Sequence, residues 1–472
     1  MYLLLTLATL AALVLSENSP AEPVTAGGYR LLLSLAGMAL VPLTAAVASA
    51  WLAGQLRQEG RRRRAAVARL LKLVRGLHAG LWLAVAAGIL YGFQWPQLVR
   101  VNWRLDHAFL LDEILILTPV LLPIVLSWAA FYRIERAVQS NAGAGCPAGP
   151  VVTGCQYLSF QVRHCMGVLL VPVVGLLAIR DGAELLLPGF RGSALAGGVY
   201  LATIVALILF FPVLLRYVWR TQPLAAGPLR ARLEVVARRA GFRAREILVW
   251  NTNHLAVNAA VAGLLPHLRY VFLTDGLLEH LNDEKVEAVF GHEIGHLRHR
   301  HLLLRLSALV APVSLWLLLG QLFPWVRERF GELASSLGGS GQVHVALVAV
   351  MGLASYMLLV FGPYCRLLER QADLFGCRML APEAESGPVE TYVAALEGLA
   401  TASGVDRDAP SWQHASIARR IEFLCRVGRD PEYEVHFQRR VRWLSALIVA
   451  AVFSPVACQI LLLGLGSAKY IL

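Results

Sequence analysis

Charged side chains are scarce in this sequence, and lysine is the scarcest of them. Only 16% of the 472 residues are charged and 57% are hydrophobic, whereas soluble globular proteins have about 25% and about 45–50%. A compact soluble core cannot bury so large an apolar fraction, so the composition excludes an ordinary soluble domain and predicts a membrane protein. Lysine occurs only at Lys72, Lys285 and Lys469, so arginine supplies nearly all of the basic charge.

Several motifs of other protein classes are missing as well. The seven cysteines are odd in number and include no C-x-x-C pair, so we expect free thiols rather than a disulfide framework. No glycine-rich phosphate loop, nucleophile elbow or nucleic-acid-binding motif stands out in the sequence. These absences argue against a nucleotide-binding enzyme, a serine hydrolase and a nucleic-acid partner.

Apolar runs of about 20 residues, the length that crosses a bilayer as a helix, recur along the chain. The first run is short and lacks a basic amino-terminal region, so we expect a retained anchor rather than a cleaved signal peptide. We predict about nine spans, near residues 1–16, 29–55, 78–95, 108–132, 163–179, 194–216, 303–324, 342–363 and 442–466.

The net charge of +12 predicts the orientation of these spans. If the N-terminus is inside and the spans alternate, the outside segments carry seven basic and seven acidic residues, so the positive excess lies mostly inside. Arg57 and the run Arg61–Arg64, just after the second span, favour the same orientation because basic residues collect on the cytoplasmic side. We expect a bacterial inner membrane protein with a cytoplasmic N-terminus. The outside segments are then 17–29, 96–107, 180–193, 325–341 and 467–472.

Two longer polar segments interrupt the apolar pattern, and we expect both on the inside. In the first segment the pattern predicts three helices. One covers 229–241, one begins after Thr274 and Asp275, and one covers about 283–300 with Asn282 or Asp283 as its cap. It also predicts strands at 246–250, 254–263 and 268–274. The second segment is largely helical in pattern. The predicted organisation is a transmembrane region of about six spans (1–216), the first part of a small α+β domain (217–302), a transmembrane hairpin (303–363), the second part of that domain (364–441) and a last span (442–472).

The helix expected near 283–300 contains His292-Glu293-Ile294-Gly295-His296. Two histidines four residues apart lie on one helical face and can bind one metal ion, although an amphipathic helix can also carry two histidines by chance. Catalytic zinc takes three protein ligands and keeps one position open. A third histidine at position 302, as in the metzincins, is excluded because that residue is Leu302.

Residues 364–377, YCRLLERQADLFGC, supply a candidate third ligand on the same side of the membrane. Glu369 and Asp373 are four residues apart and share a helical face. Glu369 can ligate zinc, and Asp373 can accept the second imidazole N–H of a ligating histidine. Alone, this pair would indicate a solvated charged face with Arg366 and Arg370, but the paired histidines on the same side of the membrane favour a metal site.

The order HEIGH, transmembrane hairpin, ERQAD resembles the integral-membrane zincins of the CAAX prenyl protease and HtpX type. The stretches NAAVAG (258–263), TDGLLEHLNDEKVEAVFGHEIGH (274–296) and HASIARRIEFL (414–424) are similar to further motifs of these proteins, with Ala415 where proline is usual. The resemblance covers about residues 217–430. The spans before it are more numerous than in the HtpX type, and the final span fits neither type.

This resemblance implies a metal site and a catalytic base. His292, His296 and Glu369 would hold one zinc ion per chain, with Asp373 supporting a histidine ligand. Glu293 would act as the general base toward a zinc-activated water.

The resemblance also implies contacts to the substrate. His414 would lie near the developing oxyanion, and Arg420 would support either Asp373 or the oxyanion. Asn258 and Ala259 would belong to an edge strand that binds an extended peptide by β-addition. Ordinary structural roles remain open for all four residues.

Two further pairs of residues have simpler interpretations. His299 and His301 follow the motif without ligand spacing and, with the neighbouring arginines, indicate a basic helix end at the membrane interface. Asp112 and Glu113, near the start of a span, are candidate functional residues by default, or simply reach the outer interface.

The sequence therefore predicts a mainly α, polytopic membrane protein with a gluzincin-type HEXXH domain split by a transmembrane hairpin. The expected activity is zinc-dependent hydrolysis of peptides or membrane proteins at the cytoplasmic face, whether or not the substrate is prenylated. One alternative is a sensor or relay of the BlaR/MecR type, which the short outside segments disfavour. Another is a non-enzymatic scaffold with structural zinc, for which Cys365 and Cys377 are the candidate extra ligands.

Overall fold

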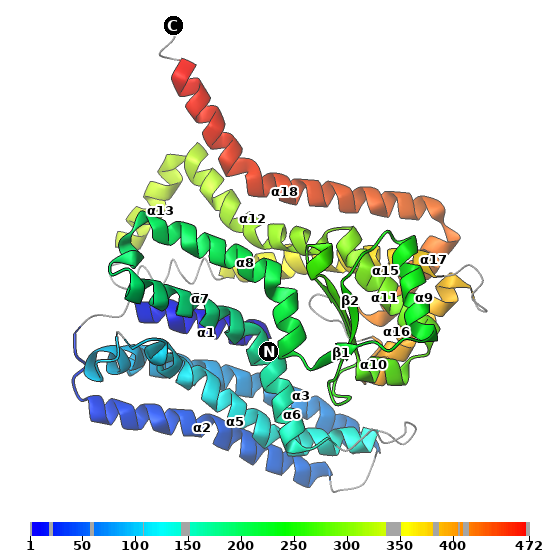
Figure 1. Ribbon diagram of the computed structural model, residues 1–472. Coiled ribbons are helices and arrows are strands. Elements are labelled where there is room, and N and C mark those ends of the chain that lie inside the picture. The colour runs from blue at the N-terminus through cyan, green and yellow to red at the C-terminus, as the bar shows by residue number, and fades with distance from the viewer. Residues whose placement is uncertain are drawn as a thin grey trace. The chain divides into compact units, whose positions relative to one another are not determined.

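The structure is a computed structural model of the chain. The residues it describes are 2–17, 22–56, 61–106, 108–142, 152–336, 351–380, 387–404, 406–408 and 415–468. Helices dominate this part of the chain (Figure 1). Contacts divide the chain into two compact units, one formed by Met1–Gln222, Trp250–Leu255 and Ala262–Tyr270, the other by Pro223–Val249, Ala256–Val261 and Val271–Leu472.

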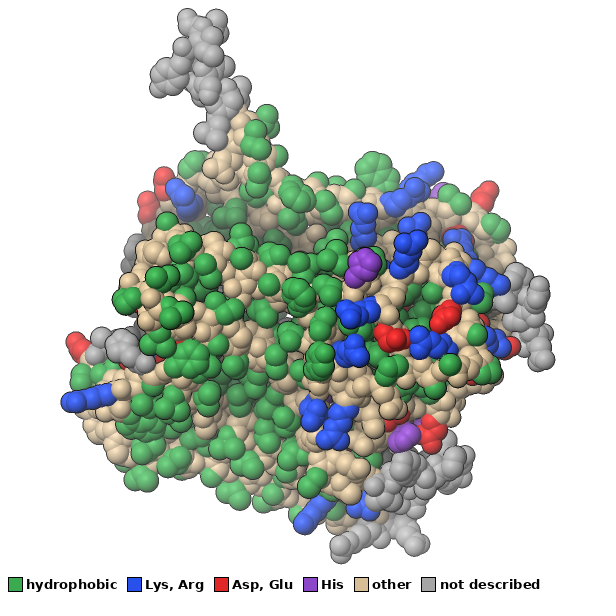
Figure 2. Space-filling view, in the orientation of Figure 1, with side chains coloured by type: hydrophobic (Ala, Val, Ile, Leu, Met, Phe, Trp, Pro, Cys, Tyr) green, Lys and Arg blue, Asp and Glu red, His purple; other side chains and the backbone are tan. Residues whose placement is uncertain are grey.

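Eight helices within the described residues are long and apolar enough to cross a membrane, and they coincide with eight of the nine expected spans. The first expected span corresponds to α1 (Tyr2–Glu17), whose apolar part is shorter. Many apolar side chains on these helices are exposed, and Figure 2 shows a broad band of them with few charges. The eight are Gly27–Leu56, Arg69–Gly92, Leu111–Ala137, Gly154–Leu186, Ala194–Val218, His301–Leu322, Met351–Met379 and Pro431–Leu461.

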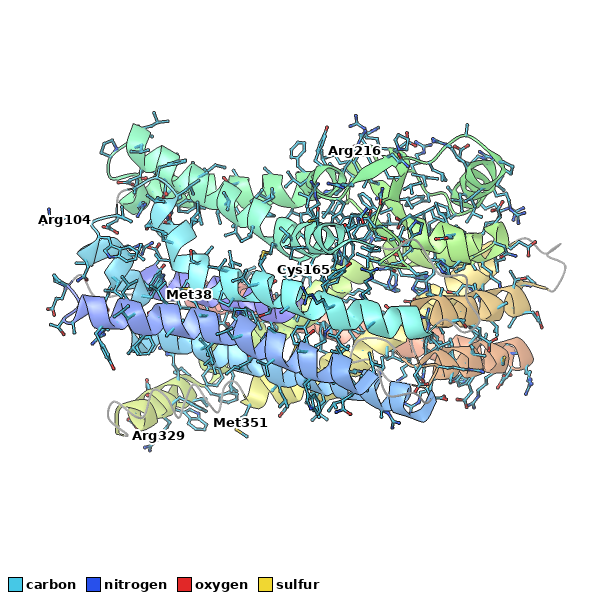
Figure 3. The ribbon with its side chains drawn as sticks, turned by 90° about the horizontal axis from the view of Figure 1, so that it is seen from below. Met38, Arg104, Cys165, Arg216, Arg329 and Met351 are labelled. Carbon is cyan, nitrogen blue, oxygen red and sulfur yellow. The ribbon has the colours of Figure 1, made fainter. Side chains whose placement is uncertain are left out.

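The first unit is a helical bundle. Its core lies where α2 (Gly27–Leu56), α3 (Arg61–Ala87) and α5 (Leu111–Ala142) pack together, with Met38, Trp82 and Ile116 buried between them. The Trp82 indole N–H donates to the carbonyl of Val120 at 2.9 Å, so its one polar atom is satisfied within the apolar core. Cys165, which Figure 3 labels together with Met38, belongs to the same core. The remaining helices are α4 (Trp95–Gln97), α6 (Gly154–Gln161), α7 (Val168–Leu186) and α8 (Ala194–Val218).

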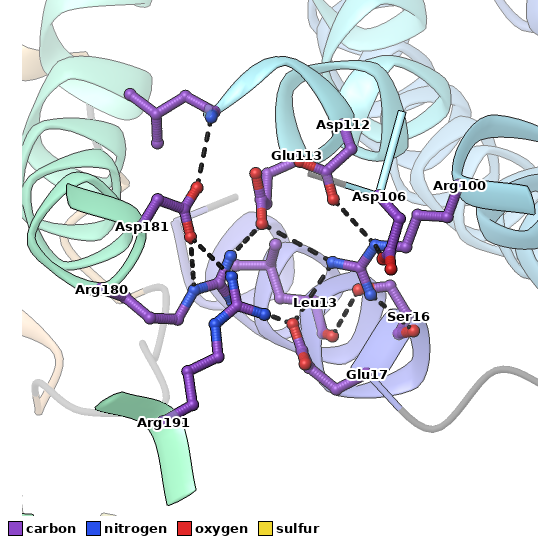
Figure 4. Close-up of polar contacts among 11 residues, drawn as sticks. Leu13, Ser16, Glu17, Arg100, Asp106, Asp112, Glu113, Arg180, Asp181 and Arg191 are labelled. Carbon is purple, nitrogen blue, oxygen red and sulfur yellow. Dashed lines mark hydrogen bonds and ion pairs between the residues drawn. The ribbon is translucent and has the colours of Figure 1, made fainter. Parts of the chain in front are cut away.

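An ion-pair network joins three segments expected on the outside (Figure 4). The Arg100 guanidinium donates to Asp112 at 2.8 Å, and Arg180 donates to Glu17 at 2.9 Å and also to Glu113. These contacts bring 17–29, 96–107 and 180–193 to one end of the bundle, as alternating spans require. Arg104 belongs to the expected outside segment 96–107. In Figure 3 it lies at the opposite end of the unit from Arg216. Asp112 and Glu113 are only 3% and 2% exposed, so they are buried ion-pair partners rather than residues that reach water. The basic cluster after the second span has no described side chains.

Four short strands form one sheet in the order β1 (Thr221–Pro223), β2 (Glu246–Trp250), β4 (Tyr270–Thr274), β3 (Ala259–Ala262). The strand expected at 246–250 is confirmed, and the one expected at 268–274 begins two residues later. The expectation of a strand throughout 254–263 is wrong, because only β3 is extended there. Asn253 and His254 have φ values of +54° and +59°, which an extended strand does not allow. β3 lies at an edge of the sheet.

The helices of the second unit begin at the expected caps. Thr274 accepts from the backbone N–H of Leu277 at the start of α10 (Asp275–His280), and Asn282 accepts from that of Lys285 at the start of α11 (Asp283–Arg298). The expected helix at 229–241 is α9 (Pro228–Arg239). The others are α12 (His301–Leu322), α13 (Pro324–Ser336), α15 (Gly362–Met379), α16 (Pro388–Ser403), α17 (Ile417–Arg429) and α18 (Pro431–Ala468).

Small residues allow α11 and α15 to pack closely. A Cβ added at Gly295 would lie 3.1 Å from the Cα of Ala372, and one added at Gly376 would lie 2.8 Å from the backbone nitrogen of His292. Glycines four residues apart on α11, Gly291 and Gly295, face this contact. The close approach brings the histidines of α11 next to the carboxylates of α15.

Candidate metal centre

Three side chains from α11 and α15 converge on one point. The Nε2 atoms of His292 and His296 are 3.1 Å apart, and they lie 3.7 and 3.5 Å from the two carboxylate oxygens of Glu369. Glu369 is 2% exposed and the two histidines are half-buried. Two imidazole nitrogens and one carboxylate oxygen that all lie within 4.8 Å of one another form a donor set able to hold a metal ion.

Asp373 lies one helical turn beyond Glu369 and orients the ring of His292. Its Oδ1 is 2.9 Å from Nδ1 of His292 and accepts a hydrogen bond from the hydroxyl of Tyr392, also at 2.9 Å. Arg420 of α17 donates through Nε to Oδ2 at 2.8 Å and through Nη2 to Oδ1. The Nε2 atom of His292 therefore faces the candidate metal position.

Burial and neighbouring charges shift the pKa values of three side chains around the candidate metal position. Burial by itself lowers the pKa of His292, but the hydrogen bond and negative charge of Asp373 outweigh this effect, so the pKa is raised. Burial, and then the same carboxylate, raise the pKa of Tyr392 well above its usual value, so the phenol keeps its proton. Burial, followed by the charge on His292, lowers the pKa of His296 well below the usual value.

Two residues of α12 contact the metal-binding side chains. Arg305 donates through Nη2 to Oε1 of Glu369 at 2.5 Å. The Nδ1 atom of His301 lies 2.8 Å from Nδ1 of His296. A helix does end at Arg298, as expected, but His301 is only 1% exposed and is a buried neighbour of the site. Arg300, between α11 and α12, has a left-handed backbone conformation with φ of +56°, and His301 follows it directly.

A cavity of about 340 Å³ opens next to these residues. Its polar side includes His292, Glu293 and Glu369, and Asn258 lines it just before β3. Apolar side chains from α16, among them Leu396 and Leu399, form much of the remaining wall. The cavity is large enough to admit an apolar side chain beside the candidate metal position.

The predicted substrate-binding residues lie at this cavity and at the neighbouring sheet edge. The backbone of Asn258 pairs with Thr274, whose N–H donates to the Asn258 carbonyl at 3.0 Å. Ala259 begins the edge strand β3 and is buried. Arg420 lines the cavity and donates a hydrogen bond to Asp373. Support of Asp373 was the first of the two roles expected for this arginine. His414 lies outside the described residues.

No pattern in the sequence singles out Tyr392, Arg305 or Gln371 as residues of the site. Tyr392 belongs to a helix that follows Asp373 by about 20 residues of chain, so no short-range spacing links the two. Arg305 and Gln371 occur at helical spacings that many surface residues share. The one signal in the sequence that could have indicated these contacts was His301, five residues after His296. The turn that separates the two histidines is not specified by the sequence.

The geometry thus defines a class of protein, a helical membrane protein with a candidate metal centre made of two histidines and a glutamate. Residues 223–424 match the model of peptidase family M48. The protease HtpX homologue of Aeropyrum pernix is 30% identical over 228 residues, which cover 44% of this chain and 67% of that protein. The chain belongs to peptidase family M48.

A second curated relative and one solved structure are also similar to this chain. The protease HtpX homologue of Thermoplasma acidophilum is 27% identical over 204 residues, covering 42% of this chain and 59% of that protein. A crystal structure of S. mikatae Ste24p is 16% identical, with a TM-score of 0.43, and covers 85% of this chain and 100% of that chain. The family and the apolar helices together make this chain a multi-pass membrane metalloprotease.

Proposed function

We propose that the protein is a zinc-dependent endopeptidase that cleaves membrane or membrane-associated proteins at the cytoplasmic face of the membrane. The observation that carries this proposal is the convergence of His292, His296 and Glu369. His292 and Glu369 line one cavity together with Glu293.

The distances between the donor atoms support zinc as the metal. Ligands of a tetrahedral zinc ion at about 2.0–2.1 Å lie about 3.3 Å from one another. The Nε2 atoms of His292 and His296 are 3.1 Å apart, and each has an oxygen of Glu369 within 3.7 Å. Three protein ligands with a cavity on the fourth side are typical of catalytic sites, whereas structural sites are closed by a fourth residue. Among the described residues, the cluster contains no cysteine, which disfavours the scaffold with structural zinc.

Glu293 is the proposed general base. Its carboxylate would take a proton from the attacking water and later pass it to the leaving amine of the cleaved peptide. When bound, zinc would supply Lewis-acid chemistry that polarises the scissile carbonyl and acidifies water. Arg305 and Asp373 would hold Glu369 and His292 in their ligating positions, and His414 would donate a hydrogen bond to the oxyanion.

The substrate would bind as an extended strand along β3. An edge strand offers unpaired backbone groups, and bonds to them depend little on the substrate's sequence. Side chains that alternate along such a peptide would enter the apolar cavity lined by Leu396 and Leu399. This favours unfolded or extended segments of membrane proteins as substrates.

Cleavage of an unfolded membrane protein by the purified enzyme tests this proposal. We expect Glu293→Gln to bind zinc normally and to lose activity by at least about 100-fold, because a general base contributes about 10²–10⁴. Glu422→Gln, on α17 and away from the cavity lining, is the matched control and should cleave like the wild type. Equal cleavage by Glu293→Gln and the wild type would reject the mechanism.

A further inference from the structure

One ligand histidine of the candidate metal centre, His296, contacts a second imidazole, whereas the other contacts a carboxylate. The helix α11 ends at Arg298, and Arg300 adopts the left-handed conformation, with φ of +56°, directly before α12 begins. After this turn the ring of His301 lies at 76° to that of His296, with 4.9 Å between the ring centres. The contact is short, since the two Nδ1 atoms are 2.8 Å apart.

The contact continues away from the metal position through two amides. The Nε2 atom of His301 lies 3.0 Å from Oε1 of Gln371 on α15. The amide nitrogen of Gln371 in turn donates to Oε1 of Gln438 on α18, at 2.6 Å. His301 and Gln371 are 1% and 5% exposed. Polar groups this deeply buried depend on one another for hydrogen bonds.

Metal binding would give this chain of contacts a single direction. A histidine that ligates through Nε2 carries its proton on Nδ1, so His296 must donate to Nδ1 of His301. His301 then accepts on Nδ1 and carries its own proton on Nε2, where it donates to the Gln371 carbonyl oxygen. Each donor in the sequence meets an acceptor as far as Gln438.

We propose that His301 is the positioning residue for the ligand His296, and that it works as a neutral hydrogen-bond relay fixed by Gln371 and Gln438. His292 differs, because its partner is the carboxylate of Asp373. Outer partners of metal-bound histidines fix the ring orientation and tautomer, and their loss typically weakens metal binding by about 10- to 100-fold. The relay links the metal centre to α18, a helix apolar enough to span the membrane. The inference rests on the proposed zinc site.

Zinc affinity of the full-length protein, measured by competition with a chelator, tests this inference independently of cleavage. All variants carry Glu293→Gln, so that no activity is involved. His301→Leu fills the same space without an acceptor and should bind zinc about 10- to 100-fold more weakly. His301→Asn, whose side-chain oxygen lies close to the Nδ1 position, should recover most of this loss. His299→Leu removes a ring that stacks on His301 and is the matched control.

Three outcomes decide the matter. If His301→Leu binds zinc as tightly as His299→Leu, or if His301→Asn binds no better than His301→Leu, the relay is wrong while the zinc site stands. If the protein that carries Glu293→Gln alone binds no zinc, the proposed function itself fails. If His301→Leu does not fold, Gln371→Leu and Gln371→Glu replace it. Only the first should weaken zinc binding, since Glu keeps the acceptor, and equal affinity of the two would overturn the relay.

Discussion

At the scale of single residues, Asp373 holds together three side chains of the metal centre. It is fully buried and accepts from Arg420, Tyr392 and His292. Removing one partner of a buried ion pair leaves an uncompensated charge, which costs about 3–5 kcal/mol. Arg420→Met should therefore destabilise the protein by about that amount, whereas Tyr392→Phe, which removes one hydrogen bond, should cost about 1 kcal/mol.

Thermal denaturation in detergent measures both effects on the zinc-free protein. Arg419→Met, a neighbour on the same helix, is the matched control for loss of an arginine. Comparable melting temperatures for Arg420→Met and Arg419→Met would contradict the structural role of the buried pair.

The two ligand histidines should respond differently to pH. Only a neutral imidazole binds zinc, and the pKa of His292 is raised whereas that of His296 is lowered well below the usual range. Zinc binding is therefore complete above the pKa of His292 and weakens as the pH falls through it. The affinity should fall about tenfold per pH unit, the dependence of one proton. Calorimetric titrations between about pH 6 and 8 measure the slope. A two-proton slope would show that His296 titrates as well.

At the residue scale, the sequence predicts which side chains share one face of a helix. It predicts few of the contacts that these side chains make with other helices. The spacings of His292 with His296 and of Glu369 with Asp373 follow from helical periodicity. The contact of Tyr392 with Asp373 depends on how α16 packs, which no local pattern records. The function of His301 depended on the left-handed turn at Arg300, a conformation that arginine rarely adopts.

At the scale of elements, the distance between α11 and α15 determines whether the metal ligands meet. Gly376→Ala would place a methyl group 2.8 Å from the backbone of His292 and 2.7 Å from the ring of Tyr392. The helices would have to separate, at about 1–3 kcal/mol, and the ligands would separate with them. We expect at least about tenfold weaker zinc binding.

Gly398→Ala on α16 is the matched control, because its added methyl group would meet only ordinary contacts of 3.7 Å or more. Zinc affinity and melting temperature are the measurements. Unchanged zinc binding by Gly376→Ala would mean that close packing of the two helices is not required.

The elements themselves were largely predictable. Polar caps such as Thr274 and Asn282 mark helix starts because their side chains satisfy free backbone N–H groups. The strand near 254–263 was predicted too long, since its apolar residues suited a strand while the backbone at Asn253 and His254 did not. The position of β3 at the sheet edge agrees with the expected edge strand.

At the scale of the whole molecule, the charge distribution predicts which face of the membrane carries the catalytic domain. Glu328 lies in a segment expected outside, and Asp408 lies in one expected inside; both side chains are exposed. In cells with an intact inner membrane, an impermeant maleimide should label Glu328→Cys above the wild-type background but not Asp408→Cys.

Lysed cells provide the control, because both variants should then react. Labelling of Asp408→Cys alone in intact cells would reverse the orientation. The metal centre and its chemistry would then face the other compartment.

The central claim is that one zinc ion, held by His292, His296 and Glu369, makes this membrane protein a peptidase. Titration of the chelator-stripped enzyme with zinc, with cleavage followed at each addition, tests it most directly. We predict no cleavage without metal and a linear rise that reaches its plateau at one zinc per chain. Full cleavage by the stripped enzyme, or zinc binding at one equivalent without any cleavage, would contradict the claim.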